Sequence, residues 1–305
     1  MKKSFKLFLV LLLVFIIVDR LISFGLGSMA NKVVTGQGVG KVNQFLKIKD
    51  SVNLLVFGSS RANHHVENQM LDTASFNMGV DGTKLGQSAG LISTLNKKNQ
   101  IILVHIDQST VFDEAYQASD ILNLINITSD YKSVKSLIFD FFPEEIYVTN
   151  AINSYAYNGK VLSIFKNYFM PDGGYMKHRG YDPLVPSEAQ KEIFEALIKN
   201  NDFVKDKRSK FEINGAVDIL VGFIKNKGEE LNSRVIFFTS PSLRPISGQM
   251  RSATENYFKS KEAEYYDYSD FDDGSNKSYW KDFTHMSAKG ARAFTKEIEV
   301  LIKRK

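Results

Sequence analysis

The chain contains no cysteine among its 305 residues. This absence excludes disulfides, a thiolate nucleophile and any cysteine-based zinc site. It also excludes lipid attachment through an N-terminal cysteine and S-palmitoylation. If the protein is held at a membrane, the polypeptide itself must hold it.

Proline is scarce, with 6 residues, and no low-complexity tract or repeat of fixed period occurs, which argues against a long disordered segment. The net charge is only +5 and no basic stripe with interleaved aromatic residues is present, so nucleic-acid binding is not expected. No cofactor is indicated. His64 and His65 are adjacent, point in different directions and have no acidic or histidine partner at metal-ligand spacing.

Residues 1–30 predict a signal anchor. A positive flank, MKKSFK, precedes the unbroken apolar run Leu7–Val18, which Asp19 and Arg20 interrupt before it resumes to Leu26. These twenty positions suffice to span a bilayer if Asp19 and Arg20 pair or lie near the far interface. A cleaved signal peptide is the alternative, and we favour the uncleaved anchor. Either way the positive flank stays inside, so the domain is expected outside the cytoplasm, at the cell membrane.

Residues 31–50 are expected to form a juxtamembrane linker. They contain GQGVGK, which superficially suggests a phosphate loop, but no strand precedes it and the full Walker spacing is missing. We therefore expect a flexible spacer between the anchor and the domain at 51–305.

From residue 51 onward, short apolar runs alternate with segments of helical periodicity. Helices are predicted at 64–71, 83–98, 215–231 and 287–304. Strands that are apolar on both faces and alternate with helices indicate an α/β three-layer sandwich around a parallel sheet. Five strands are predicted, at 52–58, 74–80, 101–107, 234–240 and 264–269.

Residues 109–232 do not follow this rhythm. They include an aromatic-rich stretch, the glycine-rich loop MPDGGYMKHRGYDPLVP and the helical pattern IFEALIKNN. A segment of this length between two strands is expected to be a helical insertion or cap. Because ligands bind beyond the carboxyl ends of the strands in such sheets, a cap there would shape the substrate site.

Three short motifs stand near the expected strand and helix ends. Gly58-Ser59-Ser60 follows the first strand, NMGVDG (77–82) follows the second, and DFTH precedes the last helix. A turn brings Asp282 and His285 of DFTH together, and the carboxylate then orients an imidazole whose other nitrogen faces a nucleophile. Taken singly, these motifs have simpler explanations: Ser60 ends a strand and caps a helix, and DxxH lies at the surface.

In this order, the motifs resemble those of the SGNH (GDSL-like) hydrolase and acyltransferase superfamily. The resemblance covers residues 52–110 and 233–303 and implies a flavodoxin-like sheet of the SGNH type. It implies that Ser60, third in the first motif, is the nucleophile, and that the acid and base are Asp282 and His285. The amides of Ser60 and Gly82 would form the oxyanion hole.

The third family motif is missing. The family has Gly-x-Asn-Asp after the third strand, with the Asn as an oxyanion donor, whereas this chain has Asp107 and Gln108. Gln108 is the candidate replacement, because its amide can donate and an ionised Asp107 cannot. Loss of one oxyanion donor typically slows such enzymes by about 100- to 1,000-fold.

GSSR in place of GDS, with a membrane anchor, resembles the envelope branch of the superfamily, whose members modify or deacylate cell-wall and exopolysaccharide glycans. The resemblance implies an extracytoplasmic esterase or O-acyltransferase acting on an acylated glycan or another ester. A transferase would need an acyl donor delivered across the membrane by a membrane partner. The alternative is a glycan-binding or assembly scaffold that keeps the fold without activity.

Other polar residues near the motifs have open roles. Arg61 is a candidate for binding a substrate carboxylate, with a structural ion pair as the alternative. Trp280 is a candidate for walling the pocket or stacking on a sugar, with packing as the alternative. His105 is expected to be a hydrogen-bonded core histidine. His178 and Arg179 are expected in a solvated loop, with a glycan contact as the alternative.

Overall fold

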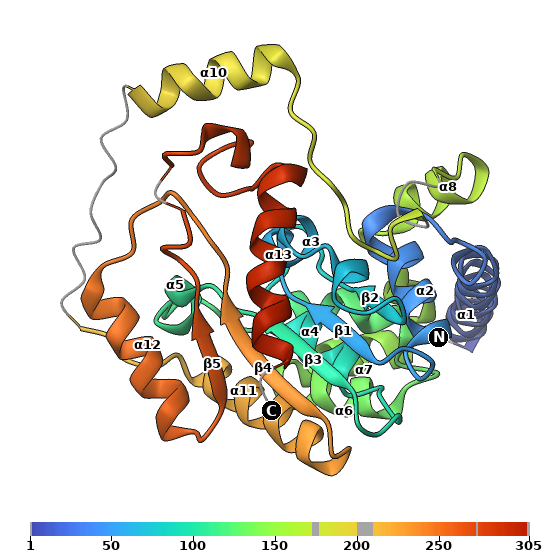
Figure 1. The fold of residues 1–305 in the computed structure, drawn as a ribbon. Coiled ribbons are helices and arrows are strands. Elements are labelled where there is room, and N and C mark those ends of the chain that lie inside the picture. The colour runs from blue at the N-terminus through green and yellow to red at the C-terminus, as the bar shows by residue number, and fades with distance from the viewer. Residues whose placement is uncertain (1, 173–176, 200–209, 273, 304–305) are drawn as a thin grey trace.

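The computed structural model describes residues 2–172, 177–199, 210–272 and 274–303 (Figure 1). Within these ranges five strands form one sheet in the order β2-β1-β3-β4-β5, and every neighbouring pair is parallel. Each strand falls inside a predicted run, so the parallel α/β sheet is confirmed. The strands are β1 (Leu54–Phe57), β2 (Ser75–Asn77), β3 (Ile101–His105), β4 (Arg234–Thr239) and β5 (Glu264–Asp267).

Helices connect the strands and cover the sheet. The α-helices are α1 (Lys2–Ala30), α2 (Lys41–Ile48), α3 (Ser60–His65), α4 (Leu85–Ile92), α5 (Gln108–Val111), α6 (Lys132–Phe141), α7 (Pro143–Ala151), α8 (Val161–Phe169), α10 (Glu188–Lys199), α11 (Gly215–Glu230), α12 (Gly248–Ser260) and α13 (Ala288–Lys303). Shorter helical turns are η1 (Gly36–Gly40), η2 (Asn68–Met70), η3 (Ser119–Ile127), η4 (Asn153–Tyr157) and η5 (Lys277–Tyr279).

The helix predicted at 64–71 is wrong, because α3 ends at His65 and only the turn η2 follows. The side-chain amide of Asn77 on β2 donates hydrogen bonds to the carbonyls of Ala62 and Val66. Val66 is extended, and the carbonyl of Ala62 that would accept the next helical bond is taken. Contacts from a neighbouring strand therefore end this helix.

Alternate side chains of β1 enter two different cores. Leu55 and Phe57 pack with residues of α2, α4, α11 and α12, whereas Leu54 and Val56 pack with residues of α3 and α13. Figure 1 shows α13 crossing one face of the sheet with α4, α6 and α11 on the other. Burial on both faces explains why the strand sequences lack polar alternation.

Residues 31–50 fold against the sheet, so the prediction of a flexible spacer is wrong. Phe45 on α2 is fully buried and meets Phe57 of β1 edge-on, with the ring centroids 5.5 Å apart. Lys41 is buried too, and its ammonium donates to the side-chain oxygen of Asn63 and to the carbonyl of Gly79. A short amphipathic helix begins directly after the glycines of GQGVGK, and the glycines led to the wrong prediction of a spacer.

The predicted insertion lies between β3 and β4, and its helices pack at different sites on the domain. Helix α11 packs on the sheet as a crossover, and α8 and η4 contact α1. Helix α10 lies beyond the carboxyl ends of the strands, where a cap was expected (Figure 1). The ring of Phe194 on α10 packs edge-on against the ring of Phe283, with the two centroids 5.6 Å apart. Residues 173–176 of the glycine-rich loop lie outside the described residues.

The N-terminal helix α1 is long and apolar enough to cross a membrane. Asp19 and Arg20, which interrupt its apolar sequence, form the expected ion pair, with Arg20 Nη1 2.8 Å from Asp19 Oδ2. Pairing lowers the cost of placing these charges in a mostly apolar helix.

Replacing Phe45 tests whether α2 belongs to the folded domain. We expect Phe45→Ala to lower the free energy of unfolding by about 3–5 kcal/mol, because it leaves a cavity against Phe57. The matched control is Lys47→Ala, an exposed position on the same helix, which should change stability by less than about 0.5 kcal/mol. Denaturant unfolding of the full chain in detergent measures both, and equal stability of the two variants would contradict the packing role.

Candidate active site

The turn after β1 delivers two serines to the carboxyl edge of the sheet. Gly58 has φ +138°, and a Cβ there would lie 2.7 Å from the Cβ of His105, so only glycine fits. Ser59 caps α3 by accepting a hydrogen bond from the amide of Arg61 at 3.3 Å. Ser60 follows as the first residue of α3. It stands beside β1 and β3, where the strand order reverses and ligands bind in sheets of this type.

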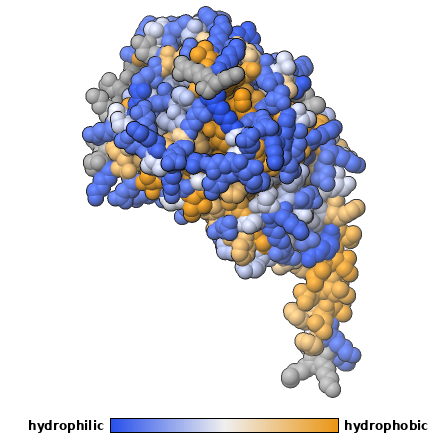
Figure 2. Space-filling model, turned by 60° about the horizontal axis from the view of Figure 1, so that its bottom comes forward, coloured by the Kyte–Doolittle hydropathy of each residue, from blue (hydrophilic) through white to orange (hydrophobic). Residues whose placement is uncertain are grey.

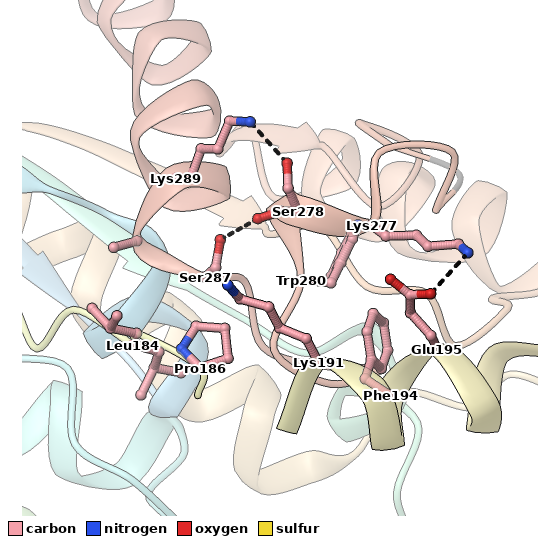
Figure 3. Close-up of a pocket in the computed structure, with 12 residues that line it drawn as sticks. Leu184, Pro186, Lys191, Phe194, Glu195, Lys277, Ser278, Trp280, Ser287 and Lys289 are labelled. Carbon is pink, nitrogen blue, oxygen red and sulfur yellow. Dashed lines mark hydrogen bonds and ion pairs between the residues drawn. The ribbon is translucent and has the colours of Figure 1, made fainter. Parts of the chain in front are cut away.

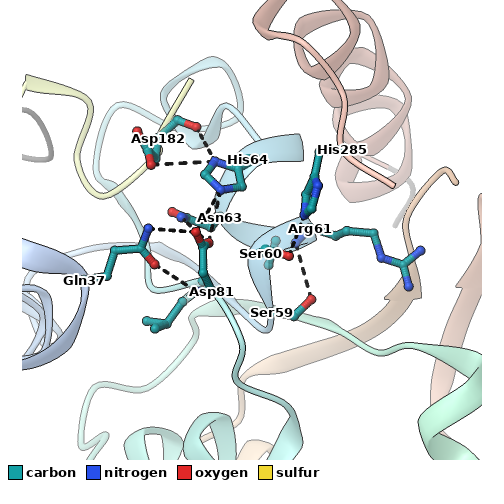
Figure 4. Close-up of polar contacts among 12 residues, drawn as sticks. Gln37, Ser59, Ser60, Arg61, Asn63, His64, Asp81, Asp182 and His285 are labelled. Carbon is teal, nitrogen blue, oxygen red and sulfur yellow. Dashed lines mark hydrogen bonds and ion pairs between the residues drawn. The ribbon is translucent and has the colours of Figure 1, made fainter. Parts of the chain in front are cut away.

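Ser60 and His285 are 225 positions apart in sequence and in hydrogen-bond contact in the structure. Ser60 Oγ lies 2.9 Å from His285 Nε2 (Figure 4). Nδ1 of the same ring lies 2.9 and 3.1 Å from the two carboxylate oxygens of Asp282. Because Nδ1 faces the carboxylate it carries the ring proton, and Nε2 is free to accept the hydroxyl proton of Ser60. The structure therefore brings the predicted nucleophile, base and acid together.

The turn that holds Asp282 also keeps its carboxylate ionised. Partial burial favours the neutral acid, but the His285 ring and the amides of Thr284 and His285 all donate to it. These hydrogen bonds outweigh burial and hold the pKa of Asp282 well below its usual range. The acid is thus charged and positioned to orient the imidazole at neutral pH.

Packing fixes the loop 280–286 that carries the acid and the base. Trp280 and Met286 close the loop as an antiparallel bridge. Trp280 is 1% exposed, and its indole N–H donates to Asp272 Oδ2 at 2.6 Å. The amide of Met286 donates to His65 Nε2 at 3.0 Å. The ring of Trp280 is packed, which matches the packing alternative, and Trp280 also lines the cavity between α10 and α13, as expected of a residue that walls a pocket.

Ser59 also touches a histidine, but that pair lacks an acid. Ser59 Oγ lies 3.2 Å from Nδ1 of the buried His105, which confirms the expectation of a hydrogen-bonded core histidine. His105 Nε2 has no hydrogen-bond partner among the described residues. Burial, aided by the charge of Arg61, lowers the pKa of His105 well below its usual value. Geometry therefore favours Ser60 over Ser59 as the nucleophile.

The end of β3 carries an ion pair where the family pattern has an oxyanion donor. The guanidinium of Arg61 pairs with Asp107 and donates to the carbonyl of Ser240. Burial, together with the nearby Arg244, lowers the pKa of Arg61 to about 10, so it remains charged at neutral pH. Figure 4 shows this side chain turned away from Ser60. The prediction that Arg61 binds a substrate carboxylate is not supported, since its carboxylate partner is Asp107.

Gln108 does not take the place of the missing asparagine. Its side chain is buried, and its amide nitrogen donates to the Tyr265 hydroxyl at 3.0 Å. The other expected oxyanion donors are the backbone amides of Ser60 and Gly82. Gly82 has φ +75°, and no described heavy atom lies within 4 Å of a Cβ built on it, so its surroundings are open. The amides of Ser60 and Gly82 remain the candidates for the oxyanion hole.

A second histidine, His64, lies beside His285, and its partners were not predicted from the sequence. His64 Nε2 lies 3.1 Å from Asp81 Oδ1, and Nδ1 lies 2.7 Å from the carbonyl oxygen of Asp182 (Figure 4). Its ring is 5.8 Å from that of His285. Burial disfavours the charged ring, but the hydrogen bonds to Asp81 and Asp182 outweigh it and raise the pKa of His64. The only sequence signal was the position of Asp81 directly before Gly82.

The described part of the glycine-rich loop reaches this cluster instead of standing apart in solvent. Asp182 contributes its carbonyl to His64, and the carbonyl of Arg179 accepts a hydrogen bond from the amide of Asn77 at 2.9 Å. The side chains of His178 and Arg179 are exposed, as expected. The loop therefore joins the insertion to the edge strand β2.

Two cavities are lined by residues that neighbour candidate site residues in sequence. One, of about 430 Å³, opens between α10 and the start of α13 (Figure 3). Its lining residues include Leu184, Lys191, Phe194, Ser287 and Lys289. Another, of about 290 Å³, is lined by residues on both sides of Gly82, including Asp81 and Thr83. Ser287 lies two positions after His285, and Asp81 and Thr83 border Gly82, so each cavity adjoins a segment that carries a candidate site residue.

A scan against protein-family models finds no match for this chain, and a search of curated proteins finds none either. What the site does is therefore inferred from its geometry.

Replacing Asp81 tests the charge on His64. A raised pKa stabilises the fold fully below the unfolded value of about 6.5, and this stabilisation is lost as pH rises through the folded pKa. We expect Asp81→Asn to lower the pKa of His64 and to cost more stability near pH ~5.5 than near pH ~8.5. Imidazole NMR titration and unfolding at both pH values measure this. Asp140→Asn, at an exposed position on α6, is the control, and an unchanged His64 titration in Asp81→Asn would contradict the assignment.

Proposed function

We propose that the protein is a serine esterase or O-acyltransferase of the SGNH type. The observation that carries the proposal is the continuous hydrogen-bonded chain from Ser60 through His285 to Asp282 at the carboxyl edge of a parallel sheet. The order of the motifs supports it, since GSS follows β1, NMGVDG begins at the end of β2 and DxxH directly precedes α13. This arrangement of nucleophile, base and acid suits acyl transfer.

The first half of the reaction transfers the acyl group to the enzyme. His285 Nε2 takes the hydroxyl proton while Ser60 Oγ bonds to the ester carbonyl carbon, whose π electrons move onto oxygen. The amides of Ser60 and Gly82 donate hydrogen bonds to this oxyanion. When the intermediate collapses, the bond to the alcohol oxygen breaks. The imidazolium returns its proton to the alcohol, and the acyl group remains on Ser60.

The second half decides between the two activities. Water activated by His285 releases the carboxylic acid and makes the protein an esterase. A sugar hydroxyl entering at the same place accepts the acyl group and makes it an O-acyltransferase. Both outcomes use the same triad and regenerate the free serine. The transferase would require an acyl donor delivered by a membrane partner.

The proposed substrate is an acylated glycan of the cell envelope. The positive flank of α1 is expected to stay in the cytoplasm, which would place the domain and its site on the other side of the membrane. The cavities beside the segments that carry His285 and Gly82 would give a polymer more contact surface than a small ester needs. The lysines at the rim of the larger cavity would interact favourably with acidic sugars.

Labelling with a serine-reactive phosphonate probe tests the nucleophile. We expect the full-length protein to be labelled, Ser60→Ala to lose the labelling, and Ser59→Ala to keep it. The neighbouring serine is a matched control because it shares the turn and touches a histidine without an acid. In-gel fluorescence with intact-mass analysis measures the modification.

Each outcome of the labelling has a definite meaning. Loss of labelling in Ser59→Ala alone would move the nucleophile by one residue. A folded wild-type protein that takes no label would overturn the enzyme proposal and favour the glycan-binding scaffold. A cooperative thermal transition in each variant shows that lost labelling is not lost folding.

A further inference from the structure

Helix α1 presents apolar side chains to its surroundings over most of its length. Leu7, Leu21 and Phe24 are 60%, 66% and 77% exposed. In Figure 2, α1 stands out from the mostly hydrophilic body as an orange stalk. A surface of this size is not normally left in water, and hydrocarbon is the solvent that suits it.

A buried carboxylate ties this helix to the insertion. Asp19 is 5% exposed, and its oxygens accept hydrogen bonds from the amides of Asn153 and Ser154 at 2.9 and 3.0 Å. These amides begin η4 and would otherwise lack partners, as the first N–H groups of any helix do. Arg20 completes the contact by pairing with Asp19 and reaching the carbonyl of Ala151. The body is thus fastened to α1 at the level of Asp19.

The apolar surface of α1 continues past this contact toward the body. Leu21 and Phe24 come after Asp19 along α1, toward the body, and both are strongly exposed. Five residues of α-helix rise about 8 Å. The body therefore overlaps about the last 8 Å of the apolar part of α1. At this level, one face of α1 contacts the body and the other faces carry side chains that require lipid. The start of η4 and the end of α7 share that layer.

The end of α7 has side chains typical of protein surfaces at the boundary between lipid and water. Tyr147, Val148 and Ala151 are exposed, and Ala151 follows the other two by four and three positions, which places it beside both on the helix surface. Ala151 is also the residue whose carbonyl Arg20 contacts. An aromatic residue with a polar tip beside aliphatic ones is typical of protein surfaces at the membrane interface.

We propose that α7 and η4 are embedded in the interfacial layer of the bilayer beside α1, in the leaflet next to the body. The partner is the lipid of that leaflet, which Tyr147, Val148 and Ala151 contact. Together with α1 this second attachment fixes the tilt of the body, and with it the height of the Ser60 edge above the membrane. The proposal does not depend on whether Ser60 is a nucleophile.

The cysteine-free chain makes a direct test possible. Single spin labels are attached to Val148→Cys and Ala151→Cys in the full-length protein, reconstituted in phosphatidylcholine vesicles. Val300→Cys on α13 and Val185→Cys before α10 are matched controls at exposed apolar positions, and α13 covers the opposite face of the sheet (Figure 1). Collisions with oxygen, which concentrates in lipid, are compared with collisions with a water-soluble nickel chelate.

We expect oxygen to dominate at positions 148 and 151, and the nickel chelate to dominate at 185 and 300. Asp19→Ala should shift 148 and 151 toward the nickel chelate while leaving the controls unchanged. Labels at 148 and 151 that behave like the controls in the wild-type background overturn the proposal. Labels that keep their lipid contact in Asp19→Ala overturn the role of Asp19. Phosphonate labelling is assayed separately, so failure of one proposal is distinguishable from failure of the other.

Discussion

The hold of the Asp282 carboxylate on the His285 imidazole is the interaction on which the rest of the site depends. One short turn supplies both groups, and the amides of Thr284 and His285 keep the acid ionised by donating to it. The ring is thereby restricted to one tautomer and one direction. Without that restriction, Ser60 would be an ordinary serine at the start of a short helix.

Both ends of the turn are buried in the core between the sheet and α13. Trp280 and Met286 bridge the base of the turn, and His65 of α3 accepts the amide of Met286. Helix α3 also carries Ser60, so Ser60 and the loop that carries His285 are attached to the same element. This common attachment explains how residues 225 positions apart are held at 2.9 Å before any substrate arrives.

The features that the sequence predicted correctly are those that repeat locally or follow a strand end. The strands β1 and β3 were recognisable because burial on both faces makes them almost continuously apolar. Ser60 and His285 were recognisable because their motifs border such strands or the last helix. Helix α2 was missed because glycines precede it and it is only 8 residues long, too short for its periodicity to stand out.

Apart from Ser60 with His285, the polar pairs formed across elements were not predicted from the sequence. His64 with Asp81 and Asp182, and Arg61 with Asp107, join residues whose distance depends on how loops pack above the sheet. Nothing in the chain order distinguishes these carboxylates from solvated ones. The same holds for Asp19, whose amide partners come from an insertion more than 130 residues away.

The ion pair at the end of β3 bears directly on the proposed chemistry. A bare carboxylate at Asp107 would oppose negative charge developing near Ser60, and Arg61 offsets it. The guanidinium of Arg61 is engaged by Asp107 and does not point to the candidate site. The side-chain amide of Gln108 donates to the Tyr265 hydroxyl and not toward the position expected for the oxyanion. The amides of Ser60 and Gly82 are then the candidate donors, where the family pattern has a third from a side chain. With two donors instead of three, the proposed acyl transfer is expected to be slower.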